Sequence, residues 1–217
     1  MKRKLLSVIM ALAMMLTLLP ATAFAANETA GSTEIATEED LTEAIAAAQP
    51  GDTVTLTGDI DVTAPIVITK ELTLNLAGNT LSNQKYIWDD TVNNWSLISV
   101  RAGGDLTITG NGTLKAKKDD CYAVDVMDGG ICTIENGTFD GNIHAVYVLE
   151  GMLVVNGGTF SVQQKYSVSD KADEFVLNCY DDHYRNGSAS ILVTGGVFVN
   201  FDPSNCQAEG AGTCFMS

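Results

Sequence analysis

The chain has 217 residues and carries 27 acidic against 12 basic side chains, which gives a formal net charge of −15 at pH 7. A chain this acidic repels phosphate backbones, so nucleic acid is not an expected partner. The same charge argues against cleavage of pectate-like polyanions without the help of a metal.

Residues 1–25 have the pattern of a bacterial-type secretory signal. Three basic residues at 2–4 precede an apolar run from 5 to 19, and small residues at 23–25 suit cleavage. A membrane anchor is the alternative, but an apolar run of about 15 residues is short for a span. We therefore expect a secreted protein that has no membrane insertion after the signal is removed.

Residues 26–51 form an N-terminal segment in which the sequence predicts one amphipathic helix. Thr37 can cap this helix, the acids at 38–40 suit its positive end, and the run 50–52 ends it. Its apolar side chains recur at the spacing of one helix face, at Leu41, Ala44, Ile45 and Ala48. We expect this face to cover the open apolar end of the repeats that follow, and binding of a partner is the alternative.

Residues 52–217 contain five copies of one strand-and-turn unit. Each copy alternates apolar and polar residues and closes on a large apolar residue: Leu81, Leu114, Phe139, Phe160 and Phe198. The steps between these residues are 33, 25, 21 and 38, and the shortest suits one three-strand coil of a β-solenoid. Copies of this kind cannot bury their apolar sides alone, so they must stack.

A second set of strands precedes the first. It lies at 97–100, 123–126 and 145–148, with a fourth copy near 175–178 whose register could slip by one residue. Strands in a fixed order joined by short corners predict an all-β fold, a single-stranded right-handed parallel β-helix, whose hand follows from the parallel-crossover rule. Four valines of this set are expected to point into the core: Val124, Val126, Val146 and Val148.

Three loop excursions interrupt the coils, at 83–96, 161–174 and 179–190. Long loops on a rigid solenoid commonly carry binding residues. The third excursion contains Asp182, His183 and Arg185, which could form a polar binding patch or a solvated loop. The first contains Trp88 and Trp95, whose rings suit stacking on a sugar.

Stacking of the coils places equivalent residues in columns about 4.8 Å apart. Asp125 then falls between Ser99 and Tyr147, and Tyr122 falls beside His144. Solvated residues with local partners are one interpretation of these columns, and ligand contact is the other. The expected ligand-binding residues are Asp125, Tyr147, Asp182, His183 and Arg185, with Trp88 and Trp95 as the alternative site.

Five cysteines are present, at Cys121, Cys132, Cys179, Cys206 and Cys214. Their odd number leaves at least one unpaired, and a Cys206–Cys214 disulfide could tie down the tail of an exported chain. No Cys or His spacing typical of a metal site is present, so we expect no metal site and no cofactor. Ca²⁺ bound by clustered carboxylates is the alternative, although no Asp-rich loop has the EF-hand spacing.

The runs LTEAI at 41–45, PGDTVTL at 50–56 and LTLNLAGNTL at 72–81 resemble the opening of right-handed parallel β-helix proteins of the pectin-lyase-like superfamily. The run 195–205 resembles the closing coil of uncharacterised secreted proteins from gut-type bacteria. The similarity spans about residues 35–205. It implies the fold but no particular activity, because this fold hosts lyases, hydrolases, adhesins and tailspikes.

The chain lacks the catalytic motifs of the best-known enzymes of that superfamily. The chain lacks the Arg-x-Pro-x-x-Arg stretch of pectate lyases, and its Asp119-Asp120 pair precedes His144-Ala145 rather than the His-Gly of polygalacturonases. We therefore expect a secreted non-catalytic β-helix protein that presents a surface to a polysaccharide or to a host or cell-surface glycan. The alternative is a polysaccharide-acting enzyme, a glycoside hydrolase or lyase, with carboxylates in the 119–150 region. The candidates for catalysis are then Asp119, Asp120 and His144.

Overall fold

A computed structural model describes residues 34–164, 166–168, 171–173, 175–203 and 215–216. The signal sequence expected at 1–25 and the cysteine pair at 206 and 214 lie outside the described residues. The compact unit that carries the repeats begins at Glu34.

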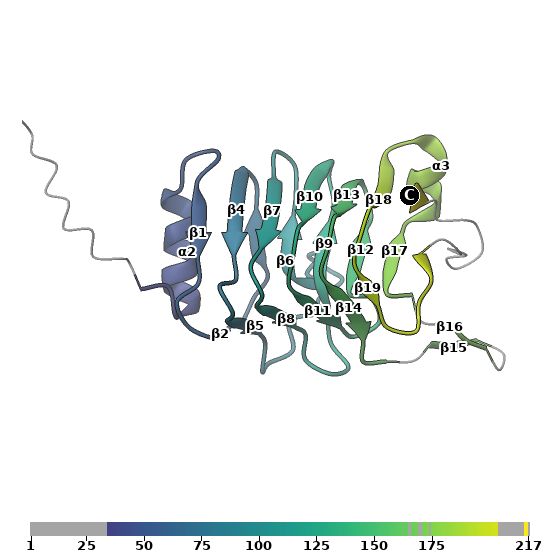
Figure 1. Ribbon diagram of the computed structural model, residues 1–217, viewed down its shortest axis with the longest axis horizontal. Coiled ribbons are helices and arrows are strands. Elements are labelled where there is room, and N and C mark those ends of the chain that lie inside the picture. The colour runs from purple at the N-terminus through teal and green to yellow at the C-terminus, as the bar shows by residue number, and fades with distance from the viewer. Residues whose placement is uncertain (1–33, 165, 169–170, 174, 204–214, 217) are drawn as a thin grey trace, which may run out of the picture. The chain divides into compact units, whose positions relative to one another are not determined.

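Three sheets of parallel strands make up most of this unit (Figure 1). Sheet A contains β1 (Thr53–Thr55), β4 (Glu71–Asn75), β7 (Asp105–Thr109), β10 (Gly130–Ile134), β13 (Gly151–Val155), β18 (Ala189–Val193) and β20 (Phe215–Met216). Sheet B contains β2 (Ile60–Asp61), β5 (Thr80–Ser82), β8 (Thr113–Lys115), β11 (Thr138–Gly141), β14 (Thr159–Val162) and β19 (Val197–Phe198). Sheet C contains β3 (Ile66–Ile68), β6 (Ser96–Val100), β9 (Tyr122–Val126), β12 (Val146–Val148) and β17 (Leu177–Cys179).

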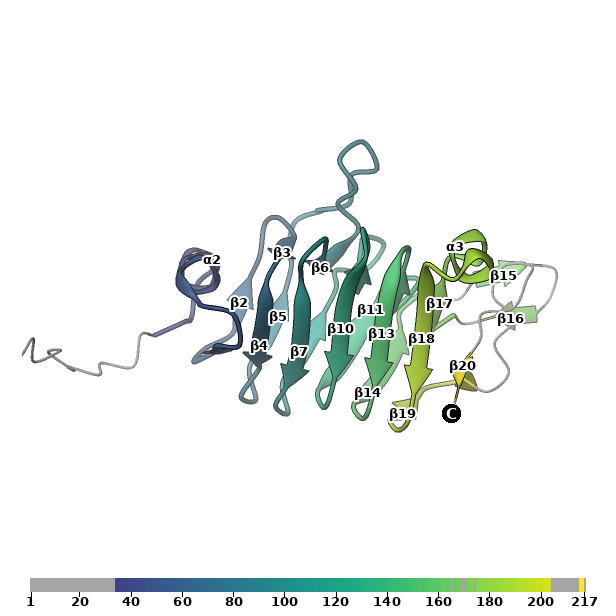
Figure 2. The same ribbon diagram turned by 90° about the horizontal axis from the view of Figure 1, so that it is seen from above.

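The chain passes through sheets C, A and B in turn, and each strand pairs with its counterpart one coil further on. Figure 2 shows the strands of successive coils side by side. This is a solenoid consistent with a parallel β-helix, as the repeats predict. The right-handed sense of the coil stays a prediction.

The register of the strands confirms the repeat. The closing apolar residues pair in order, from Leu81 to Leu114, Phe139, Phe160 and Phe198. The three phenylalanine rings stack at 5.0 and 5.1 Å between centroids. The four valines of β9 and β12 that we expected in the core are all fully buried.

Helix α2 (Glu38–Ala47) lies beside β1 (Figure 1). Thr37 caps it, because the Thr37 hydroxyl accepts a hydrogen bond from the backbone of Asp40. Its face buries Leu41 and Ile45 in the same apolar core as the coils. At the C-terminal end of the helix, the Lys70 ammonium donates hydrogen bonds to the backbone carbonyls of Ile45, Ala46 and Ala48. The helix is therefore joined to the first coil, and its role as a cap stays a prediction.

The excursions are more structured than loops. Residues 179–190 contain a short helix, α3 (Asp181–Asn186), which ends because Gly187 takes a left-handed conformation with φ of 84°. Within 161–174, β14 extends to Val162 and β15 (Tyr166–Val168) pairs antiparallel with β16 (Lys171–Asp173). The expectation of a single short N-terminal helix was thus incomplete.

Strand β17, which corresponds to the expected fourth copy at 175–178, is shifted by one residue from the expected register. Val146 pairs with Leu177, and Tyr147 pairs with Asn178. Because Val176, Leu177, Asn178 and Cys179 are all buried, the alternation that normally fixes a register is absent here.

Candidate functional site

Five rings gather on the outer side of sheet C, and we call them the aromatic cluster: Trp88, Trp95, Tyr122, His144 and Tyr147. The register of the coils brings three of them together, since β9 and β12 are neighbours. The two tryptophans come from the long connection 83–95 between β5 and β6, which projects from the stack (Figure 2). We call this connection the aromatic loop.

The rings are in mutual contact. Trp88 and Trp95 stack with centroids 6.2 Å apart, and Trp95 meets Tyr147 edge-on at the same distance. Beneath them, Tyr122 lies 5.4 Å from Tyr147 and 5.1 Å from His144. Tyr122 and His144 are buried, whereas Trp88, Trp95 and Tyr147 are half-buried. The outer surface of the cluster therefore consists of two indoles and one phenol.

Asp120 holds one part of the aromatic loop. Its carboxylate accepts hydrogen bonds from the backbone N–H groups of Ile87 and Trp88 and from the Asn83 side chain. Asp120 is 6% exposed, so these contacts replace water around a buried charge. The placement explains Asp120 as a support for Trp88, and it leaves no exposed carboxylate at this position for acid–base chemistry.

Asp125 is fully buried, although we expected it to contact a ligand. Its two oxygens accept hydrogen bonds from the hydroxyls of Ser96 and Ser99. Burial raises the pKa of Asp125 to about 6, against the lowering effect of the two serines and of Arg101. A direct ligand contact is out of its reach in this conformation, because the side chain is fully buried and both of its oxygens are engaged by serines of β6.

His144 is buried beneath Tyr122 and Tyr147. Its Nδ1 lies 2.7 Å from the carbonyl of Phe175, and its Nε2 lies 3.0 Å from the Asn178 amide nitrogen. The carbonyl can only accept, so Nδ1 carries the proton and Nε2 accepts from Asn178. Burial lowers the pKa of His144 to about 4. Both nitrogens are engaged and the ring is neutral at pH 7, which suits a packing role better than acid–base catalysis.

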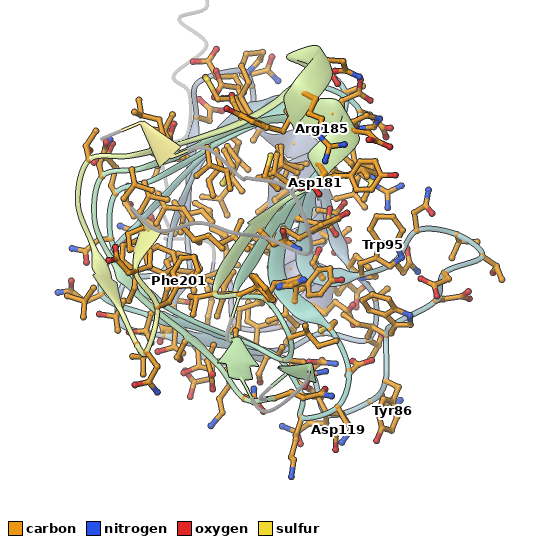
Figure 3. The ribbon with its side chains drawn as sticks, turned by 90° about the vertical axis from the view of Figure 1, so that its right-hand side faces the viewer. Tyr86, Trp95, Asp119, Asp181, Arg185 and Phe201 are labelled. Atoms are coloured by element: carbon orange, nitrogen blue, oxygen red, sulfur yellow. The ribbon has the colours of Figure 1, made fainter. Side chains whose placement is uncertain are left out.

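Two hollows adjoin the exposed rings. One, of about 240 Å³, lies between Tyr147 and helix α3 and is lined by Tyr180, Asp182 and Arg185 among others. The other, of about 540 Å³, lies on the far side of Trp88 and includes the side chains of Asp119, Asn142 and Gln164. Figure 3 shows Arg185, Asp181, Trp95, Tyr86 and Asp119 along one flank, with Phe201 on another.

Apart from the buried Asp125, the expected residues and the alternative tryptophans adjoin one surface rather than two. The hollow beside Tyr147 brings in Asp182 and Arg185, which pair with each other at 3.1 Å. His183 is turned instead toward the Leu149 carbonyl, 2.6 Å from its Nδ1. Trp88 and Trp95, which the sequence offered only as an alternative, join the same surface because Trp95 contacts Tyr147. We call this surface the aromatic flank.

Several contributors were missed in the sequence. Ser96 is the first residue of β6 and Arg101 follows its last. Nothing in their spacing indicates that Ser96 binds a buried acid or that Arg101 binds the aromatic loop. Tyr180 lines the same hollow as Asp182. An aromatic residue directly before a charged run is the sequence feature that could have identified it as a binding residue. Asn142 lines the second hollow and accepts a hydrogen bond from the Asp119 backbone.

Within the described ranges, no helix is long and apolar enough to cross a membrane. Among the same residues, no three His, Cys, Asp or Glu side chains are grouped so that they could hold a metal ion. No protein-family model, curated protein or solved structure matches the chain.

Proposed function

We propose that this is a secreted, non-catalytic parallel β-helix protein that binds a glycan on its aromatic flank. The single observation that supports the proposal is the run of Trp88, Trp95 and Tyr147 at the surface, with a polar hollow at each end. Half-buried rings present apolar faces that can stack on a sugar ring. The nearby polar side chains can bond its hydroxyls, which is the usual composition of a binding site.

Charge narrows the class of glycan. The whole chain is strongly acidic, and the hollow beside Tyr147 contains two acids, Asp181 and Asp182, against Arg185. A polyanionic polysaccharide would be repelled by this surface. A neutral or cationic glycan is therefore the ligand that we propose, as a free polysaccharide or on a cell surface.

Export and fold class belong to the same proposal. The pattern at 1–25 supports secretion, and sequencing the N-terminus of exported protein tests it, with a start near residue 26 expected. The parallel coils support a right-handed β-helix of the pectin-lyase-like kind, since parallel crossovers are nearly always right-handed.

The binding test compares the parent with Trp95→Ala on a glycan array, followed by titration calorimetry with the glycan that binds the parent best. Loss of one stacking ring should weaken binding by about 1 to 3 kcal/mol. Met152→Ala is the matched control, because Met152 is 38% exposed on sheet A, away from the aromatic flank. Equal affinities of the parent and Trp95→Ala for every glycan bound would remove the proposed site.

The enzyme alternative has less support from the geometry. Asp120 and His144 are buried with their polar atoms engaged, and Asp119 is the exposed member of the three. Release of reducing sugar from the bound glycan, compared between the parent and Asp119→Asn, tests this alternative directly. Sustained release by the parent that Asp119→Asn abolishes would establish an enzyme.

A further inference from the structure

The aromatic loop is held to the rest of the protein by an arginine. The Arg101 guanidinium donates to the backbone carbonyl of Asn93, 2.9 Å away, two residues before Trp95. The loop is also joined to sheet C where the Tyr122 backbone N–H donates to the Trp95 carbonyl. Arg101 therefore fixes the backbone of the aromatic loop two residues before Trp95, whose indole N–H in turn donates to Asp90 within the same loop.

Arg101 in turn is oriented by a chain of hydrogen bonds that ends on a buried acid. Its Nε donates to the Ser99 hydroxyl at 3.0 Å, and that hydroxyl donates to Asp125 at 2.6 Å. The chain Asp125–Ser99–Arg101–Asn93 thus links the interior of sheet C to the aromatic loop. An ionised Asp125 attracts Arg101 as well as binding the serine between them.

The other oxygen of Asp125 faces the Ser96 hydroxyl, which can bond to either protonation state of the acid. The Ser96 hydroxyl has one hydrogen but two acceptors within reach, Asp125 and the Ile98 carbonyl at 2.7 Å. If Asp125 is ionised, one of these acceptors goes without a full hydrogen bond. If Asp125 is protonated, it donates to Ser96, Ser96 donates to Ile98, and all partners are satisfied.

We propose that Asp125 is a proton-sensitive positioning residue, which holds the aromatic loop through Ser99 and Arg101 when ionised and loosens it when protonated. Its effect on ligand affinity rests on the glycan-binding function proposed above, whereas its effect on the loop does not. Acidification then removes the attraction for Arg101, releases the contact at Asn93, and weakens glycan binding without altering any ring.

The charged groups around Asp125 support a transition near neutral pH. Arg101, which follows β6, lowers the pKa of Asp125, while Asp128, which follows β9, raises it. On the other side β12 presents the phenol of Tyr147 in register. Burial outweighs these effects and brings the pKa of Asp125 to about 6. His144 stays neutral through this range, since its pKa lies near 4.

The loop can be followed without a ligand, because both tryptophans of the chain, Trp88 and Trp95, lie in it. Acrylamide quenching of tryptophan fluorescence is measured from pH 5 to 7.5. In the parent, quenching should increase on acidification with a midpoint near pH 6. In Asp125→Asn the quenching should not change with pH, since this variant lacks the titrating group. In Ser99→Ala the change with pH should be smaller than in the parent, since the hydrogen-bonded link is lost while the attraction between Asp125 and Arg101 remains.

Two further variants separate this mechanism from a general effect of acid. Asp128→Asn should move the midpoint to lower pH, because Asp128 raises the pKa of Asp125. Asp140→Asn is the matched control, since burial also raises the pKa of Asp140, which lies on β11 in sheet B. The Asp140→Asn quenching curve should match that of the parent.

Binding supplies the second measurement, with the glycan that the parent binds best as the probe. The parent should bind about fivefold more weakly at pH 5 than at pH 7.5, while Asp125→Asn binds at the weaker level throughout. Flat quenching in the parent, or an unchanged transition in correctly folded Asp125→Asn, would overturn the inference whatever the binding data. Absence of any glycan binding would remove the proposed function and leave the fluorescence result standing.

Discussion

Asp125 is a fully buried carboxyl group, and replacing it with Asn should change how the stability of the protein depends on pH. The folded protein raises the pKa of Asp125 from 3.8 to about 6. Between these values the folded state keeps the proton that the unfolded state has lost. The contribution of Asp125 to stability is therefore fully present below pH 3.8 and is lost as the pH rises through 6.

The size of the effect is set by the shift. Each pKa unit corresponds to about 1.4 kcal/mol, so a shift of roughly two units corresponds to about 3 kcal/mol between pH 3.8 and 7. Asn has nearly the same shape but does not titrate. Relative to the parent, the Asp125→Asn variant should therefore gain about 3 kcal/mol of unfolding free energy as the pH is raised across this window.

Urea unfolding of both proteins at several pH values between 4 and 7.5 measures this difference. The comparison uses the change in the difference with pH, so any constant effect of the amide on packing cancels. As a control, the dependence of the unfolding free energy on urea concentration should be the same in both proteins, which shows that both expose the same surface on unfolding. A difference in unfolding free energy that stays constant from pH 4 to 7.5 would refute the burial argument for Asp125.

The packing of the coils leads to three other predictions. His144 has its pKa lowered from 6.5 to about 4, so its contribution to stability is present above pH 6.5 and is lost as the pH falls through 4; urea unfolding of His144→Gln should lack this loss of about 3 kcal/mol. Val146→Asp buries an unpaired carboxylate in sheet C and should destabilise by about 3 kcal/mol or more, whereas Val67→Asp, at a 41% exposed position, should melt close to the parent. Deleting residues 26–51 removes Leu41 and Ile45 and should expose the core residues that they cover, so the remaining coils should aggregate. Size-exclusion chromatography measures this, and an unchanged monodisperse peak would refute the role of the helix as a cap.

The arrangement of the coils was predictable because the closing apolar residues mark equivalent positions. Leu114, Phe139 and Phe160 differ in spacing but pair in one column, since each must face the same core. The same alternation placed Asp125 between Ser99 and Tyr147 correctly. Periodicity encodes which residues share a column, and in a stacked repeat this is enough to give the register.

Burial of the acids was not predictable from the same pattern. Asp120 and Asp125 occupy corner and outward strand positions, where an acid is normally solvated. Asp120 is instead bonded to an insertion in the preceding coil, the aromatic loop, and Asp125 is bonded to two serines of β6. The contacts to Asp120 come from backbone groups at Ile87 and Trp88, and backbone contacts carry no residue-type signal.

The two acids therefore give the insertion a structural logic. Asp120 binds the loop directly at Ile87 and Trp88, and Asp125 reaches its other end through Arg101. The aromatic loop of one coil is thus held by two acids of the next coil. One attachment is at Trp88, and the other is at Asn93, two residues before Trp95. Only the attachment at Asn93 passes through a hydroxyl relay, so protonation of Asp125 loosens the loop at Asn93 while the backbone at Trp88 stays bonded to Asp120.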